Sequence, residues 1–132
     1  MLRVFFVLCL MLTAQSAFAE TSESVLASIK SEASGTSGFQ GFSPARGETF
    51  FKTKQGGEWS CSSCHTDNPA TQGKHAKTGK VIKPLAPSAN AERFTDMAKV
   101  EKWFKRNCND VLERVCTPQE KGDVLAFLLT VK

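Results

Sequence analysis

Apolar residues recur at the spacing of an α-helix in four segments of the chain. These segments predict helices over residues 22–33, 43–51, 95–115 and 117–131. No segment alternates apolar and polar residues in the way that a half-buried strand requires. The pattern therefore predicts an all-α fold.

Polar residues that can cap a helix stand where each predicted helix begins. A serine or threonine stands at the capping position of each of the first three predicted helices, at Ser22, Ser43 and Thr95. The fourth helix opens with Thr117-Pro-Gln-Glu120, the pattern of a capping box with proline at the first helical position. Gly47 lies inside the second helix, where a glycine costs stability, and this predicts a close crossing with another helix.

The third predicted helix has the strongest apolar stripe and carries one amide within it. The stripe consists of Val100, Trp103, Phe104, Val111, Leu112 and Val115. At about 100° per residue, Asn107 projects within about 45° of the centre of this stripe. A buried amide needs a partner, so the pattern singles out Asn107.

The residues Cys61-Ser-Ser-Cys64-His65 form the C-x-x-C-H run by which c-type haem is attached. Each thiol can add to one vinyl group of haem, and the histidine that follows can supply the proximal nitrogen ligand of the iron. A bare C-x-x-C would also suit a redox dithiol or half of a zinc site. A zinc site would need two more ligands, and a thioredoxin-like dithiol needs a βαβ pattern that the sequence lacks. The motif predicts one covalently bound haem c.

The first 19 residues have the pattern of a signal peptide. Arg3 gives a positive start, residues 4–12 are an unbroken apolar run, and Ala17 and Ala19 are the small residues that a signal peptidase reads. The apolar run is too short for a permanent membrane anchor. We therefore expect export to the periplasm with cleavage after Ala19. Export agrees with the haem motif, because a bacterial c-type cytochrome acquires its haem outside the cytoplasmic membrane.

The remaining residues are enough for one small domain. We expect an N-terminal helix and joint over residues 20–42, followed by a haem domain over residues 43–132. The formal net charge is +4, and no basic stretch alternates with aromatic residues as a nucleic-acid platform would. We therefore expect no nucleic-acid partner.

Residues 67–90 are rich in Gly, Pro, Asn, Thr and Lys without a sustained period. We interpret them as a loop moulded around the cofactor, since a long loop in a small domain usually has a functional reason. The loop contains His75 and four lysines: Lys74, Lys77, Lys80 and Lys83. These lysines suit either an ordinary solvated surface or a docking patch for an acidic electron-transfer partner.

Cys108 and Cys116 remain as an even pair after the haem motif and the signal peptide have taken the other three cysteines. In an oxidising compartment we expect a disulfide between them, the alternative being two buried free thiols. On one straight helix their Cα atoms would be about 12 Å apart, whereas a disulfide needs them within about 7 Å. Residues 107–110 are weak helix formers, so we expect the helix to break near Asn109.

Three residues are candidates for the second axial ligand of the iron. Met97 is the one methionine outside the signal peptide, but it falls in the first turn of its predicted helix. His75 lies ten residues after His65 in the lysine-rich loop. Asn107 has the geometry described above, although an amide is a rare ligand. The residue pattern by itself leaves these three alternatives open.

Several segments of the chain resemble the sphaeroides haem protein family of bacterial c-type cytochromes. The resemblance runs from about residue 43 to the C-terminus, and its most specific part is Arg106-Asn107-Cys108-Asn109. It also includes Thr78-Gly-Lys80, Pro84-Leu-Ala-Pro87, Arg93-Phe-Thr-Asp96, Val100-Glu-Lys-Trp103, Cys116-Thr-Pro118 and Glu120-Lys121.

The resemblance implies a small class I-like cytochrome c fold around one haem. It implies that Asn107 is the sixth ligand in the oxidised state and that a disulfide joins Cys108 to Cys116. Similarity to small cytochromes c implies that a backbone carbonyl in residues 83–85 accepts a hydrogen bond from His65. The implied partners are membrane cytochrome b and dihaem cytochrome c proteins.

Three functions follow from these expectations. The first is a periplasmic one-electron carrier with a weakly ligated iron that opens on reduction. The second is a protein that binds or senses a diatomic gas such as O₂ or NO. The third is a haem-based oxygen or NO reductase, for which the sequence offers no acid–base group beyond His75. We therefore expect an electron-transfer protein and not an enzyme, with no catalytic residues.

Overall fold

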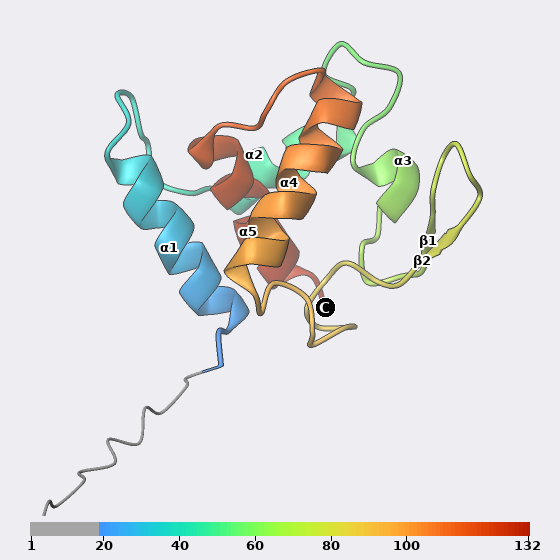
Figure 1. The fold of residues 1–132 in the computed structure, drawn as a ribbon, viewed down its shortest axis with the longest axis horizontal. Helices are drawn as coiled ribbons and strands as arrows, with labels where there is room; N and C mark the ends of the chain where they lie inside the picture. The colour runs from blue at the N-terminus through green and yellow to red at the C-terminus, as the bar shows by residue number, and fades with distance from the viewer. Residues whose placement is uncertain (1–18) are drawn as a thin grey trace, which may run out of the picture.

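The computed structural model describes residues 19–132, which form five helices and one short hairpin (Figure 1). The predicted signal peptide, apart from Ala19, lies outside the described residues. The elements are α1 (Ser22–Ser34), α2 (Pro44–Lys52), α3 (Ser62–His65), β1 (Gly73–Lys74), β2 (Val81–Ile82), α4 (Met97–Leu112) and α5 (Pro118–Thr130). None of the helices within residues 19–132 has the length and apolar character needed to cross a bilayer.

Two of the predicted helix caps are confirmed. The Ser43 hydroxyl accepts a hydrogen bond from the backbone N–H of Arg46 at the start of α2. At the start of α5, Thr117 and Glu120 form the reciprocal capping box, with bonds of 3.2 and 2.8 Å. These ends were predictable because a cap depends only on residues within one turn.

The other two caps lie one residue away from the predicted position. Thr21, not Ser22, caps α1, because Thr21 and Ser24 bond each other's backbone N–H groups. Asp96, not Thr95, caps α4 and accepts from the N–H of Lys99 at 2.9 Å. A carboxylate at a helix N-terminus is favoured over a hydroxyl by its charge.

Helix α5 is the centre of the core and is buried along most of its length. One apolar cluster joins it to α1 and α4 and contains Val25, Ile29, Val100 and Leu125. A second joins it to α2 and contains Phe51, Val124, Phe127 and Leu128. Figure 1 shows α5 (red) behind α4 (orange), with α1 (blue) alongside.

The close crossing predicted at Gly47 is confirmed. Gly47 is buried where α2 crosses α5, and a Cβ atom there would overlap the backbone carbonyl of Asp123. The neighbouring Arg46 binds the buried Asp123 carboxylate at 2.8 Å. The glycine therefore lets the two backbones approach while an ion pair fixes their crossing.

The predicted loop over residues 67–90 is mostly irregular but contains the β1–β2 hairpin. The strands are antiparallel, with Gly73 opposite Ile82 and Lys74 opposite Val81. Strands of two residues are too short to show an alternating pattern, so periodicity gave no sign of them. The fold class remains all-α, as predicted.

The predicted break near Asn109 is wrong. Helix α4 runs unbroken to Leu112, and the chain then turns through Glu113, whose φ is +58°. This left-handed turn brings the Cα atoms of Cys108 and Cys116 to 5.6 Å, and the two residues form a disulfide. The two cysteines can therefore pair because the helix ends four residues after Cys108 and the chain turns back. A bend at Asn109 is not needed.

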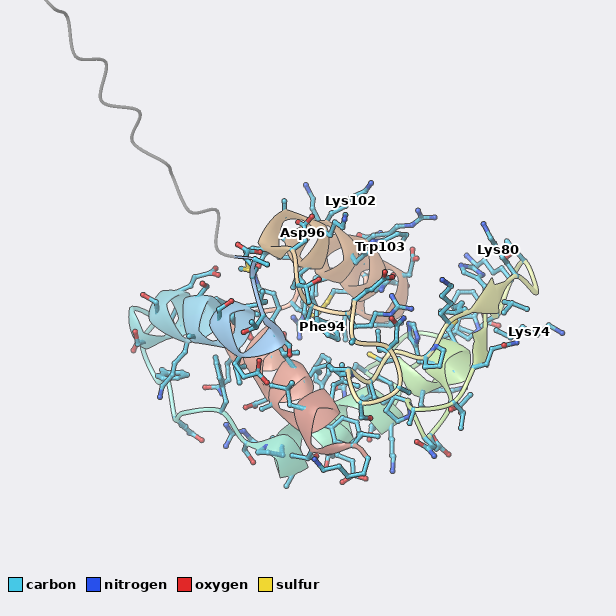
Figure 2. The ribbon with its side chains drawn as sticks, turned by 90° about the horizontal axis from the view of Figure 1, so that it is seen from below. Lys74, Lys80, Phe94, Asp96, Lys102 and Trp103 are labelled. Carbon is cyan, nitrogen blue, oxygen red and sulfur yellow. A yellow bond between two sulfur atoms is a disulfide. The ribbon has the colours of Figure 1, made fainter. Side chains whose placement is uncertain are left out.

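Two residues of the predicted apolar stripe are exposed. Trp103 is 47% exposed and Val115 is 61% exposed. The Arg106 guanidinium and the Lys102 ammonium lie 5.5 and 6.0 Å from the centroid of the Trp103 ring. Figure 2 shows Lys102 and Trp103 together on the outer side of α4. Periodicity placed Trp103 and Val115 on the inner face, but only Val100 and Cys108 of this helix are buried.

Candidate functional site

The C-x-x-C-H run forms the single turn of α3. Cys61 is its N-cap in helical conformation, and the backbone N–H of His65 donates to the carbonyl of Cys61 at 3.0 Å. The turn ends at Thr66, whose φ of +63° redirects the chain. Because one turn of helix separates Cys61 from His65, both thiols and the imidazole are presented from one compact unit.

A cluster of serines holds the start of this turn. The buried Ser60 donates its backbone N–H to the Ser63 hydroxyl at 3.0 Å. The Ser60 hydroxyl also contacts the hydroxyls of Ser62 and Ser63 at 3.0 and 3.1 Å. The sequence pattern assigned these serines no role. The signal available in the sequence was a serine directly before the first cysteine, followed by two more between the cysteines.

The hairpin packs directly on the motif. Gly73 of β1 is buried, and a Cβ atom there would overlap the Cys64 carbonyl and crowd the His65 Cα atom. The backbone N–H of Ala76, in the turn of the hairpin, lies 3.3 Å from the Cys64 sulfur and donates to it. The hairpin therefore packs on the Cys64–His65 end of α3 and holds Cys64 in place.

A cavity of about 130 Å³ lies between α3, the hairpin and α4. Its wall includes Cys61, Cys64 and His65 from the motif and Asn107 from α4. The apolar part of the wall is formed by Ile82, Leu85, Phe104 and Val111. The fold thus brings together the four residues that the sequence and the resemblance singled out, from segments more than 40 positions apart.

The His65 ring is held in an apolar environment. Its centroid lies 6.4 Å from that of the fully buried Phe51 on α2. Burial, together with the positive charge of Arg93, lowers the pKa of His65 to about 4. The imidazole is therefore neutral at physiological pH, which is the form that can bind a metal.

The two cysteines do not have the properties of a reactive dithiol. Burial raises the pKa of Cys61 to about 11, whereas a redox-active C-x-x-C motif has a lowered thiol pKa. Both cysteines are free and partly buried. Within residues 19–132, no three His, Cys, Asp or Glu side chains are grouped so as to hold a metal ion. These observations speak against the dithiol and zinc alternatives.

The structure separates the three candidates for the second ligand. Met97 packs against the core cluster around Val25 and does not line the cavity. His75 lines the cavity, but its Nδ1 atom accepts from the backbone N–H groups of Lys77 and Thr78 at 3.3 Å. Asn107 lines the cavity, and its side chain has no hydrogen bond within the described residues.

The side chain of Asn107 is exposed, which corrects the expectation of a buried amide. The apolar face of α4 is only partly covered at this point, since Phe104 and Val111 are also partly exposed. The reason is that α4 faces a cavity here and not a packed core. An uncovered apolar face beside two thiols and a neutral imidazole fits a bulky apolar cofactor that completes the core.

The expected hydrogen bond from His65 to residues 83–85 is not formed. Within the described residues, the carbonyls of Lys83 and Pro84 instead accept from the guanidinium of Arg93, at 2.8 and 2.9 Å. The Pro84 carbonyl also accepts from Asn90 at 3.3 Å. Arg93 was part of the family resemblance, but the sequence pattern assigned it no role.

Two curated proteins are identical to this chain at about half of the matched positions. Cytochrome c'' of Methylophilus methylotrophus is 55% identical over 80 residues, which is 61% of this chain and 56% of that protein. The cytochrome c-type protein SHP of Cereibacter sphaeroides is 52% identical over 82 residues, or 60% of this chain and 63% of that protein. The chain thus matches less than two thirds of each relative's length.

Two solved structures match most of the chain. Oxidized cytochrome c'' from Methylophilus methylotrophus has a TM-score of 0.72 at 42% identity, covering 84% of this chain and 94% of that one. Oxidized SHP, described as an oxygen binding cytochrome c, has a TM-score of 0.73 at 42% identity, covering 84% and 97%. The expected resemblance and the class I-like all-α cytochrome fold are confirmed.

The fold and the relatives agree on the cofactor and the class of protein. The protein is a c-type cytochrome, and its cofactor is haem c, bound covalently. A family model described as a domain of unknown function, DUF1924, matches residues 37–128. The chain therefore belongs to the DUF1924 family.

Proposed function

We propose that this protein is a periplasmic cytochrome with a single haem c that carries one electron at a time. We further propose that Asn107 is a weak second axial ligand, which leaves when the iron is reduced. The observation that carries both proposals is the cavity, whose wall contains Cys61, Cys64, His65 and Asn107. The periplasmic location rests on the signal-peptide pattern of residues 1–19.

Each residue of the cavity has a defined part in this proposal. Cys61 and Cys64 hold the cofactor through two thioether bonds, and the neutral His65 donates its ring nitrogen from the side of Phe51. When bound, the haem supplies an iron centre that takes up and releases one electron. The amide oxygen of Asn107 is a hard, weak donor, which ferric iron tolerates better than ferrous iron. Reduction therefore loosens the contact with Asn107.

A second candidate function is the binding of a diatomic gas. It is favoured by the similarity to SHP, whose structure is described as that of an oxygen binding cytochrome c. The exposed position of Asn107 on the cavity wall supports it, because a side chain at an open rim can move aside without repacking a core. The two functions are compatible in one protein. The names of both relatives describe cytochromes, and we propose no enzymatic reaction.

Carbon monoxide added to the reduced protein should shift its haem absorption spectrum at once. The shift is expected because Asn107 leaves the reduced iron and the distal position becomes open. The control is the oxidised protein, which should not respond to CO. A reduced spectrum that stays unchanged under CO would eliminate ligand release and gas binding, and would leave the electron carrier alone.

The four lysines of residues 67–90 are the proposed docking patch for an acidic redox partner. Lys74, Lys77, Lys80 and Lys83 are all exposed, and none forms an ion pair within the described residues. Figure 2 shows Lys74 and Lys80 extending outward from the hairpin. Because the hairpin packs on Cys64, the patch lies beside the motif that holds the haem. By resemblance, the partners are membrane cytochrome b and dihaem cytochrome c proteins.

Electron transfer to an acidic redox protein should become slower as salt is added. The reason is that the Debye length falls from about 30 Å at 0.01 M to about 8 Å at 0.15 M ionic strength, which removes the attraction to the lysines. Stopped-flow rates across this range measure the effect. The K74Q/K80Q double variant should flatten the salt dependence, whereas K30Q, on the exposed side of α1, should leave it unchanged. Equal slopes for both variants would favour an ordinary solvated surface.

A further inference from the structure

Arg93 has an unusual position for an arginine in this protein. Arg93 lies in the chain segment that connects β2 to α4. Its side chain turns back onto the loop that follows β2. Its Nε atom donates to the carbonyl of Pro84 at 2.9 Å, and Nη2 donates to the carbonyl of Lys83 at 2.8 Å. Nη1 has no partner within the described residues.

The charge of Arg93 is not balanced by a carboxylate within residues 19–132. Arg46 and Arg114 each pair with an acidic side chain at 2.8 and 2.7 Å, whereas no ion pair includes Arg93. Arg93 is also partly buried, and burial lowers the pKa of its guanidinium. A partly buried cation whose donors reach only carbonyls carries an uncompensated desolvation cost.

The surrounding backbone holds Arg93 in a defined orientation. The next residue, Phe94, has a φ of +59°, which is costly for an aromatic residue. The Phe94 ring packs against both core clusters and anchors the segment, and Figure 2 shows it on the inner side of α4. The N–H of Arg93 donates to the carbonyl of Asn90 at 3.0 Å. The guanidinium is therefore preorganised and is not a freely rotating surface group.

The positive charge of Arg93 lies near the cofactor site. It lies close enough to His65 to lower the pKa of that ring. The loop that Arg93 binds continues into Leu85, which lines the cavity together with His65. Haem carries two propionate carboxylates, and it is the one anionic group that this chain is already known to bind. An anionic oxygen beside Nη1 would supply both the missing hydrogen bond and the missing charge.

We propose that Arg93 is the counter-ion of a haem propionate and thereby raises the reduction potential of the haem. This inference rests on the haem of the proposed function but does not depend on Asn107 as a ligand. An unpaired propionate stabilises the oxidised iron by its negative charge. Arg93 cancels that charge and so favours the reduced state.

Reduction potentials of the holoprotein test this inference. In R93Q, the ratio of oxidised to reduced protein at a fixed electrode potential should rise about threefold to tenfold, where tenfold corresponds to 59 mV for one electron. R93K keeps the charge and should stay closer to the wild-type ratio than R93Q. The control K105Q removes the same charge from an exposed position of α4, where water screens it, and should leave the ratio nearly unchanged.

A second measurement applies even where R93Q gives no stable holoprotein. Haem labelled with ¹³C at its propionate carboxylates should show a carboxylate infrared band that shifts between wild type and R93K. Equal potentials in R93Q and K105Q, equal losses in R93Q and R93K, or an unshifted infrared band would each overturn the inference. Those results would leave Arg93 as a clamp on Lys83 and Pro84. They would not affect the proposal that the protein carries electrons. That proposal would be overturned only if the wild-type haem took up no electron.

Discussion

The N107A protein should have a ferric haem that is water-bound or five-coordinate and high-spin. The amide of Asn107 lines the cavity from α4 and has no hydrogen-bonding partner within the described residues. Alanine has no donor atom, so only water or a vacant position can replace the amide oxygen. The absorption spectrum and electron paramagnetic resonance of the oxidised protein measure this change.

Added azide gives a second, independent readout of the same variant. If Asn107 binds the iron, azide must displace it in the wild-type protein, whereas in N107A azide meets no internal competitor. If Asn107 occupies the iron in more than nine of ten molecules, the Kd for azide should fall roughly tenfold or more. The matched control is N109A, which removes an exposed amide two positions further along α4 and should leave the spectrum and the Kd unchanged.

The same experiment identifies the alternatives. A wild-type spectrum in N107A, together with an altered spectrum in H75A, would assign the second ligand to His75. We expect H75A to keep the wild-type spectrum. Nδ1 of His75 accepts from two backbone N–H groups, which places the ring proton on Nε2, the nitrogen that would otherwise bind the iron. M97A should cost stability through lost packing and leave the haem spectrum unchanged, since Met97 lies in the core.

Loss of the disulfide between Cys108 and Cys116 should destabilise the protein by about 2.5 kcal/mol. The two cysteines are buried and close a short loop with a sequence separation of 8. Constraining such a loop removes conformational entropy from the unfolded chain. In the C108S/C116S variant, chemical denaturation followed by circular dichroism should show this decrease in the free energy of unfolding.

The disulfide should also affect the proposed iron ligand, because Asn107 directly precedes Cys108. The last turn of α4 ends at Leu112, and the disulfide ties it to the segment before α5. Without that tie, part of the C108S/C116S protein should show the ferric spectrum of N107A. V115A is the matched control within the same loop, since Val115 is 61% exposed and its truncation should change stability by less than about 0.5 kcal/mol. Equal stability of C108S/C116S and V115A would contradict the prediction.

Local chemistry explains why much of this protein was predictable. The capping box of Thr117 and Glu120, the Ser43 cap and the Cys61–His65 turn each depend on residues less than two turns apart. Such contacts form in the same way wherever the segment lies, so the residue types indicate them directly. The position of Gly47 inside a helix likewise indicated a close crossing before the crossing partner was known.

The position of α4 illustrates what periodicity leaves open. Its stripe predicted one inner face, but Trp103 is exposed on the outer side of α4 and Asn107 lies at the open wall of a cavity. Whether a residue on an apolar face is buried depends on what packs against that face, which is a property of distant segments. The cofactor site is also where a helix has the least protein to pack against.

From the sequence alone came the all-α class, the haem motif, the pairing of Cys108 with Cys116 and the family resemblance that named Asn107, because each is carried by residue types at short spacings. Tertiary structure alone decided that α4 stays straight to Leu112, that a hairpin covers Cys64, and that Arg93 is partly buried beside His65 without a carboxylate. Those features depend on long-range packing and on the balance between desolvation and pairing of charge, which no short run of residues specifies.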